Sequence, residues 1–182
     1  MNKLRAVAAV MAVLVACAGV SAFAQGKLGI TSGKPSMDGV VQPKDYSYSQ
    51  DFDQQMTLYA SRTSSTLYLA VTGATTGWVA VGLGQRMDGA AIFMGFVKDG
   101  KVSFKAQMGT GHRHADAPDV TATVESYALK VNGGQTTLQV ALKAGSYIKS
   151  GQSVLDVVFA MGDQDNFTQY HSYRNTTSLK LE

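Results

Sequence analysis

The feature of this sequence that most constrains its fold is the recurrence of apolar residues at every second position. The alternation occupies four short stretches, residues 56–60, 67–71, 102–106 and 138–142. Successive side chains of a strand point to opposite faces, so a period of two indicates strands with one buried face. We find no convincing amphipathic helix. The pattern predicts an all-β, antiparallel sandwich of about nine to eleven short strands.

Turn signals separate these stretches and predict how the strands connect. Asp99-Gly100 and Asn132-Gly133 each lie between two alternating runs, and such pairs supply the positive φ angles of tight hairpins. Two segments lack a strand pattern. We expect residues 109–119, GTGHRHADAPD, to form a loop, and residues 32–53 to wrap the surface before the sheet begins.

The first 24 residues have the features of a signal peptide. Lys3 and Arg5 precede a run without charged side chains, and Ala22-Phe23-Ala24 offers a cleavage site. The run is short for a membrane span, which needs about 20 apolar residues. Residues 25–182 then form a single domain, exported to the periplasm or secreted. The alternative is a lipoprotein anchored through Cys17, because residues 14–17 resemble a lipobox.

Composition excludes several chemistries. Cys17 is the single cysteine, so the predicted domain has no thiolate for an iron–sulfur cluster, a blue-copper centre, a cysteine-bound zinc or an attached c-type haem. The net charge is only +3 and no Lys/Arg block occurs, which argues against nucleic acid as a partner. No nucleophile elbow, phosphate loop or dinucleotide motif is present. We therefore expect a carrier or a binding protein rather than a catalyst.

The predicted domain has three histidines as candidate ligands. His112 and His114 form a His-x-His pair that could bind copper or zinc, although two ligands fall short of the three or four of a zinc site. An exposed polar loop is the alternative interpretation. His171 lies where a final strand, within residues 167–181, would ordinarily carry a β-branched residue. Met87 lies at a predicted turn between two strands, where packing material is the commoner role of a methionine.

Four short motifs follow one another along the chain. They are residues 77–84 (GWVAVGLG), residues 87–90 (MDGA), Pro118-Asp119 and residues 170–174 (YHSYR). Together they resemble the DOMON domain family, which includes the cytochrome domain of cellobiose dehydrogenase. The resemblance implies an immunoglobulin-like β-sandwich that, in the cytochrome members, holds a noncovalent haem b between a methionine and a histidine. Carried over by position, these ligands are Met87 and His171.

The resemblance also suggests which residues surround the haem. Arg86, Tyr170, Tyr173 and Arg174 are neighbours of the two ligands in sequence and are candidates for the rim. Trp78, Phe93 and Phe96 are candidates for the walls, with ordinary core packing as the alternative. A Met/His pair fills both axial positions and favours electron transfer over oxygen activation. The expected function is single-electron transfer, or sensing of redox state or haem, with a separate protein as redox partner.

Two other functions fit the sequence. One is a noncatalytic carbohydrate-binding module on the same sandwich, with Trp78 and the tyrosines stacking on sugar rings. The other is a periplasmic copper-binding protein, because imidazole and thioether suit Cu(I). Its ligands would be His112, His114 and one of Met87, Met94 or Met108.

Overall fold

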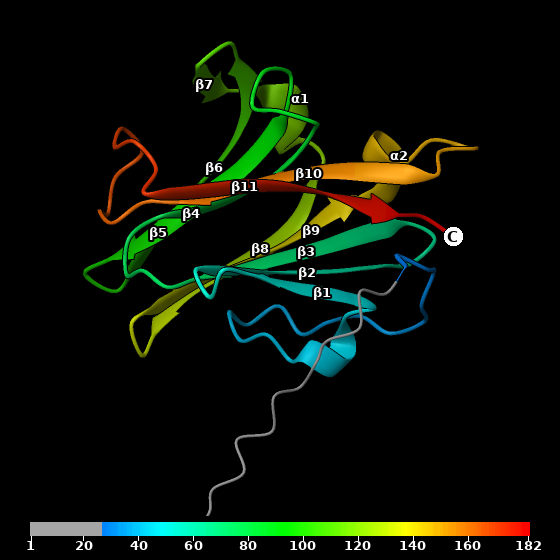
Figure 1. The fold of residues 1–182 in the computed structure, drawn as a ribbon, viewed down its shortest axis with the longest axis horizontal. Helices are drawn as coiled ribbons and strands as arrows, with labels where there is room; N and C mark the ends of the chain where they lie inside the picture. Colours follow the sequence, from blue (N-terminus) through cyan, green and yellow to red (C-terminus); the bar gives the residue numbers. More distant parts are fainter. Residues whose placement is uncertain (1–26) are drawn as a thin grey trace, which may run out of the picture.

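The computed structural model describes residues 27–182, which fold into two antiparallel β-sheets packed face to face (Figure 1). The five-stranded sheet has the order β1 (Tyr48–Phe52), β2 (Met56–Arg62), β3 (Thr66–Gly73), β9 (Gln135–Lys143) and β8 (Val124–Asn132). The six-stranded sheet has the order β11 (Tyr173–Lys180), β10 (Val154–Met161), β4 (Val79–Leu83), β5 (Ala91–Lys98), β6 (Lys101–Thr110) and β7 (Arg113–Asp116). The predicted antiparallel sandwich is confirmed.

Helical structure in the described residues is limited to three short elements, η1 (Pro43–Asp45), α1 (Pro118–Thr121) and α2 (Ala144–Tyr147). Among residues 27–182, no helix is long and apolar enough to cross a membrane. The signal peptide, its cleavage site and Cys17 lie outside the described residues, so the predictions of export and of lipidation stay predictions.

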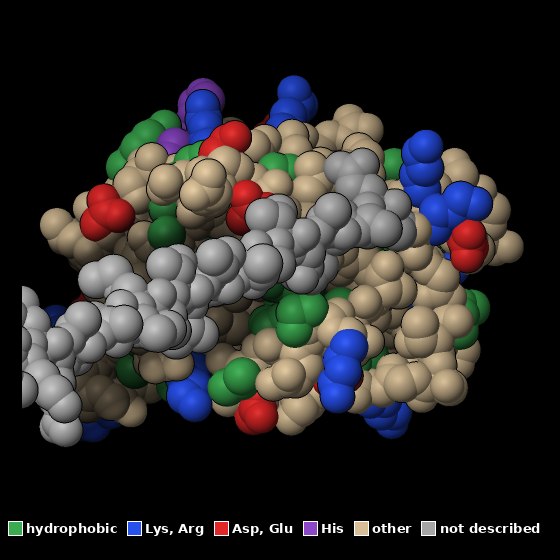
Figure 2. Space-filling model, turned by 60° about the horizontal axis from the view of Figure 1, so that its bottom comes forward, with side chains coloured by type: hydrophobic (Ala, Val, Ile, Leu, Met, Phe, Trp, Pro, Cys, Tyr) green, Lys and Arg blue, Asp and Glu red, His purple; other side chains and the backbone are tan. Residues whose placement is uncertain are grey.

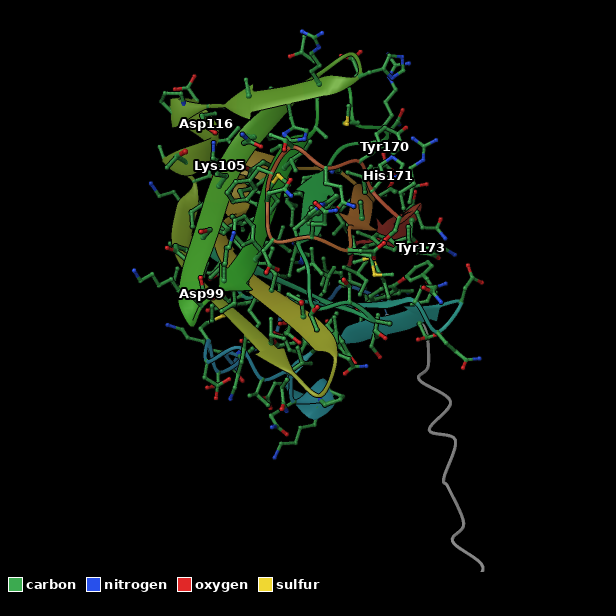
Figure 3. The ribbon with its side chains drawn as sticks, turned by 90° about the vertical axis from the view of Figure 1, so that its left-hand side faces the viewer. Asp99, Lys105, Asp116, Tyr170, His171 and Tyr173 are labelled. Carbon is green, nitrogen blue, oxygen red and sulfur yellow. The ribbon has the colours of Figure 1, made fainter. Side chains whose placement is uncertain are left out.

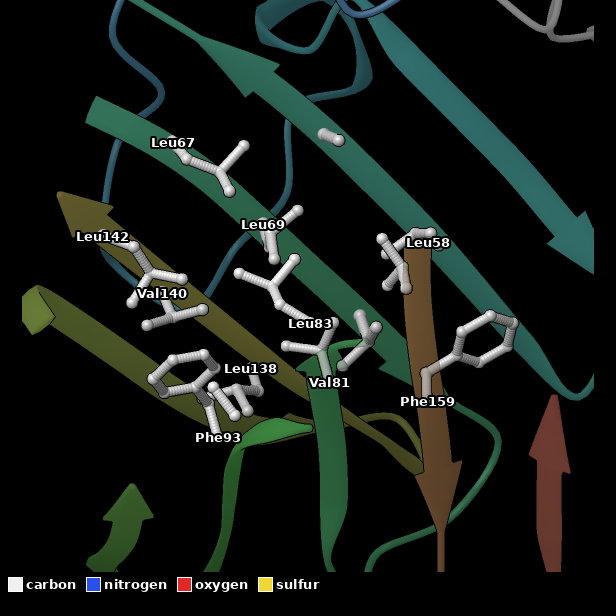
Figure 4. Close-up of a cluster of buried hydrophobic side chains, with 14 of the residues drawn as sticks. Leu58, Leu67, Leu69, Val81, Leu83, Phe93, Leu138, Val140, Leu142 and Phe159 are labelled. Carbon is white, nitrogen blue, oxygen red and sulfur yellow. The ribbon is translucent and has the colours of Figure 1, made fainter. Parts of the chain in front are cut away.

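The core lies between the sheets and is made by the alternating residues (Figure 4). Leu58, Leu69, Val81 and Leu138 are fully buried there, and burial of each such side chain contributes about 1.5–3 kcal/mol. Phe93 is also fully buried in this cluster. Phe93 is therefore an ordinary core residue, the alternative to a place in the wall of a haem site.

Both predicted hairpins are present. Asp99 and Gly100, with φ of 50° and 73°, connect β5 to β6. The second turn lies one residue later than expected, because Asn132 still pairs with Gln135 and the positive φ angles belong to Gly133 and Gly134.

Residues 109–119 are not the loop that the sequence predicted. Strand β6 continues to Thr110, and β7 pairs back onto it with Gly109 opposite His114. The sequence concealed this hairpin because β7 has a mainly exposed, polar edge and so lacks apolar alternation. Residues 32–53 are largely irregular as expected, although the segment ends in β1.

Candidate functional site

A cavity of about 450 Å³ opens on the outer face of the six-stranded sheet. This volume is within the usual range for small-molecule and cofactor sites. The cavity is lined by strands β4, β5, β7, β10 and β11, by the residue before β4, and by the segments that follow β4, β6 and β10. Its lining includes Trp78, Ala80, Gly82, Arg86, Met87, Ile92, Met94, His112, His114, Val158, Ala160, Gln169, Tyr170, His171 and Arg174.

Small residues at the centre of the sheet form the floor of the cavity. Ala80 and Gly82 on β4 lie beside Ala160 on β10, with Ile92 and Val158 around them. A Cβ atom at Gly82 would lie 2.9 Å from the carbonyl oxygen of Ala91, too close for any side chain. Because these residues are small, an apolar hollow remains on this face of the sheet. Larger side chains would fill it.

Met87 enters the cavity from the β4–β5 connection. Its side chain is half-buried and packs against the floor cluster that includes Trp78 and Ile92. Ala90 N–H donates to the Met87 carbonyl oxygen at 3.1 Å, and Gly89 N–H donates to Gly109 O at 3.0 Å. A Cβ atom at Gly109 would collide with the Met87 carbonyl. Glycine at position 109 thus lets the Met87 turn dock on β6.

His171 enters from the β10–β11 connection, two residues before β11 begins, so it does not interrupt the strand itself as the sequence suggested. The Tyr170 and His171 rings lie 4.0 Å apart, and Arg174 Nη1 is 3.5 Å from His171 Nε2. Partial burial, followed by the charge of Arg174, lowers the pKa of His171 below its usual value. The neutral imidazole, which is the metal-binding form, is therefore favoured at neutral pH.

These two connections come from opposite ends of the sheet. Strands β4 and β10 are antiparallel, and Leu83, which precedes the Met87 turn, pairs with Val157. Met161, which precedes the His171 connection, pairs with Val79 at the other end of β4. Met87 and His171 thus approach one cavity from opposite ends.

Of the residues suggested to surround the haem, Arg86, Tyr170, Arg174 and Trp78 line the same cavity. Tyr173 does not line it. Its hydroxyl donates to Asp53 Oδ2 at 2.9 Å, and its ring packs against the core between the sheets. Adjacent residues of a strand face opposite sides, so Arg174 faces the cavity and Tyr173 faces away. Phe96 lies beside the floor, packed on Phe167 with ring centroids 4.7 Å apart.

Two buried polar atoms of lining residues have no hydrogen-bond partner within residues 27–182. They are Nε1 of Trp78, a residue only 5% exposed, and Oε1 of Gln169. Buried polar atoms in proteins are nearly always paired, and an unpaired one costs about 1–3 kcal/mol. A Cβ atom at Gly162 would collide with Trp78 Nε1, so this nitrogen packs against the Gly162 backbone.

His112 and His114 also line this cavity, at its Met87 end. His114 Nδ1 lies 2.6 Å from Gln107 Oε1, and Gln107 Nε2 donates to Asp116 Oδ1 at 2.6 Å. Burial, followed by the charge of Lys105, lowers the pKa of His114. Figure 3 shows Lys105 and Asp116 on the β6–β7 side, with Tyr170 and His171 across from them.

Sequence reasoning missed Gln107, Asp116 and Gln169, because polar residues on a strand or loop carry no signal of what they face. Within the described residues, no group of three or more His, Cys, Asp or Glu side chains is placed to hold a metal ion. Of the methionines suggested for a copper site, Met87 and Met94 line the cavity and Met108 does not.

Figure 2 shows histidine side chains together at one end of the molecule, beside Lys or Arg side chains. On the visible part of this face, acidic and basic side chains are interspersed rather than gathered by sign. Arg86, which lines the cavity, forms an exposed ion pair with Asp88 at 3.5 Å. Such exposed pairs contribute little to stability.

The described residues thus form an antiparallel β-sandwich with a hollow on the outer face of one sheet, between the β4–β5 and β10–β11 connections. The model of the DOMON domain matches residues 50–163. The chain belongs to the DOMON domain family. Comparison with curated proteins gives no match.

Solved structures with the same fold include two cytochrome domains. The cytochrome b domain of pyranose dehydrogenase from Coprinopsis cinerea is 12% identical, with a TM-score of 0.58 over 74% of this chain and 81% of that one. The cytochrome domain of Myriococcum thermophilum cellobiose dehydrogenase is 14% identical, with a TM-score of 0.54 and the same coverage. A family 9 carbohydrate-binding module from Caldicellulosiruptor kristjanssonii, in complex with glucose, is 11% identical, with a TM-score of 0.52 over 85% of this chain and 94% of that one. At these identities the likeness shows the fold alone.

Proposed function

We propose that this chain is an exported b-type cytochrome domain that holds haem b in the outer-face cavity and takes part in single-electron transfer or in redox or haem sensing. The observation that carries the proposal is that Met87 and His171 line one cavity and reach it from opposite ends of the sheet. A planar cofactor gripped on both faces needs one ligand from each side. A redox partner would be a separate protein.

The residues present fit the chemistry of the cofactor. Thioether sulfur and neutral imidazole nitrogen are both haem-iron ligands. The apolar floor of Ala80, Gly82 and Ala160 suits a porphyrin, and the guanidinium groups of Arg86 and Arg174 suit propionate carboxylates. The group would supply a one-electron redox centre when bound.

The chain's own residues would set the properties of that centre. Met87 and His171 would together hold the group, and this pair of ligands favours electron transfer over oxygen activation. A methionine ligand also raises the midpoint potential relative to two histidines. The β10–β11 connection and Phe167 cover part of the face and would exclude water from it.

The test is reconstitution of the purified protein with haem b. We expect a six-coordinate, low-spin absorbance spectrum and, in the reduced protein, the upfield-shifted methyl resonance of an iron-bound methionine. His171→Ala should abolish the low-spin spectrum, and Met87→Ala should remove the methyl resonance and lower the midpoint potential. Met108→Ala is the matched methionine control, because Met108 is partly exposed and does not line the cavity. A protein that takes up no haem would refute the proposal.

A specific observation favours sugar binding as a second candidate. Tyr170 is 75% exposed at the cavity rim, and an exposed aromatic ring can stack on a sugar. The similar carbohydrate-binding module was solved with glucose. Calorimetry with glucose and cello-oligosaccharides on haem-free protein would support this function if heat of binding appears and Tyr170→Ala removes it.

A further inference from the structure

We propose that His114 is an alternative haem-iron ligand at the Met87 end of the cavity, able to take the place of the Met87 thioether; this inference rests on the proposed haem function. Its position beside Met87, its hydrogen bonds and its tautomer support this role.

Position follows from the pairing of β6 with β7. His114 is directly opposite Gly109, and paired residues of antiparallel strands point their side chains to the same face. Gly109 on that face lies against the Met87 carbonyl. His114 therefore lines the cavity beside Met87, while His171 reaches it from the other end.

Orientation follows from a chain of hydrogen bonds that begins at a carboxylate. The Asp116 carboxylate, held 3.2 Å from Lys105 Nζ, can only accept, so the amide NH₂ of Gln107 must face it. Gln107 Oε1 then faces His114 Nδ1 at 2.6 Å and can only accept from it. His114 Nδ1 thus carries the proton.

The consequence is a free lone pair on His114 Nε2. Histidines that bind metals commonly donate their other ring N–H to an oxygen acceptor, which fixes the tautomer and the ring orientation. Gln107 has this role here and is only 5% exposed, so its amide is held in place. His114 could bind iron without releasing a proton.

His112 provides the contrast. It lines the cavity as well, but it lies exposed at the turn of the β6–β7 hairpin, whereas His114 is half-buried. His112 is therefore the matched control for removal of an imidazole from this hairpin.

The experiment compares haem-loaded Met87→Ala, Met87→Ala/His114→Ala and Met87→Ala/His112→Ala by absorbance and electron paramagnetic resonance. We expect Met87→Ala to stay low-spin with two imidazole ligands and a midpoint potential below that of the original protein. Met87→Ala/His114→Ala should become high-spin, and Met87→Ala/His112→Ala should match Met87→Ala. A high-spin Met87→Ala protein, or a low-spin Met87→Ala/His114→Ala protein, would overturn the inference while haem binding by the original protein stands.

A second measurement needs no haem. Nitrogen-15 NMR of the imidazole rings in the haem-free protein should show His114 as the Nδ1–H tautomer, and Gln107→Leu should abolish this preference. A predominant Nε2–H tautomer in the original protein would overturn the inference without bearing on Met87 and His171. Failure of the original protein to take up haem would instead refute the proposed function, and the ligand role of His114 with it.

Discussion

The outer faces of the two sheets are built from similar residues but are covered differently. On the five-stranded sheet, Tyr68, Ala70 and Ala141 are buried under the segment that precedes β1, here called the N-terminal segment. Met37 and Tyr46 of this segment pack on them. On the six-stranded sheet, the comparable small residues Ala80 and Ala160 form the floor of a cavity. The chain itself fills one hollow and leaves the other open.

A buried polar side chain helps to hold the cover on the five-stranded sheet. Gln139, fully buried under the N-terminal segment, accepts from Gly39 N–H at 2.7 Å and Asp38 N–H at 3.2 Å and donates to Ser36 O at 2.8 Å and Tyr46 Oη at 3.1 Å. Burial raises the pKa of Tyr46 to about 12. Trp78 Nε1, on the open side, has no partner among the described residues. Ser61 Oγ, opposite Tyr68 on the covered face, also lacks a partner among the described residues, so unpaired polar atoms occur on both faces. What distinguishes the covered face is that Gln139 holds the segment before β1 onto it.

The largest expected effect is on the covered face. Gln139→Leu would leave the Asp38 and Gly39 amides and the Ser36 carbonyl without their partner, and we expect the free energy of unfolding to fall by about 3 kcal/mol. Urea denaturation measures this loss. Haem affinity should not change, since none of these residues lines the cavity.

The control is Gln135→Leu on the same strand. Gln135 is exposed at the start of β9, so its replacement should change stability by no more than about 0.5 kcal/mol. Equal effects of the two substitutions would show that the N-terminal segment is not held by Gln139, and the contrast between the faces would fail.

A pair of alanine substitutions tests the contrast directly. Ala160→Leu should fill the open floor, lowering haem affinity about tenfold or more, equivalent to about 1.4 kcal/mol, while the free energy of unfolding changes by less than about 1 kcal/mol. Ala141→Leu overpacks the covered face and should cost about 1–3 kcal/mol of stability without affecting haem affinity. Haem titration and urea denaturation of both variants give the comparison. If Ala141→Leu lowers haem affinity and Ala160→Leu does not, the haem site lies on the five-stranded sheet and not in the cavity described above.

Much of this contrast was visible in the sequence, and some was not. Alternation and turn residues predicted the strands and both hairpins, because period two and positive φ are local properties. Strand β7 was missed because exposed edge residues have no alternation. The cover over the five-stranded sheet was expected only as a surface segment, since the partners of Gln139 are about a hundred positions away.

For the site, the family resemblance supplied Met87 and His171, and the structure brings them to one cavity. The chain from His114 through Gln107 to Asp116 depends on which residues pair across β6 and β7, and this hairpin was read as a loop. Tyr173 could have been excluded, however. Once Arg174 was placed at the rim, strand alternation already put its neighbour on the opposite face.

Substitutions at Tyr173 and its neighbour have the smallest expected effects. They test which side chain of β11 faces the core and which faces the cavity. Tyr173→Phe removes the hydroxyl that donates to Asp53 and accepts from Asn175, so we expect a loss of about 0.5–1.5 kcal/mol in the free energy of unfolding and unchanged haem affinity. Arg174→Gln, one residue along on the exposed cavity side, should weaken haem binding with little effect on stability, because it removes a cation from the rim. Denaturation and haem titration of the two variants separate these roles. Equal weakening of haem binding by Tyr173→Phe and Arg174→Gln would contradict this assignment. It would mean that Tyr173 also faces the haem site, although strand alternation places its side chain toward the core between the sheets.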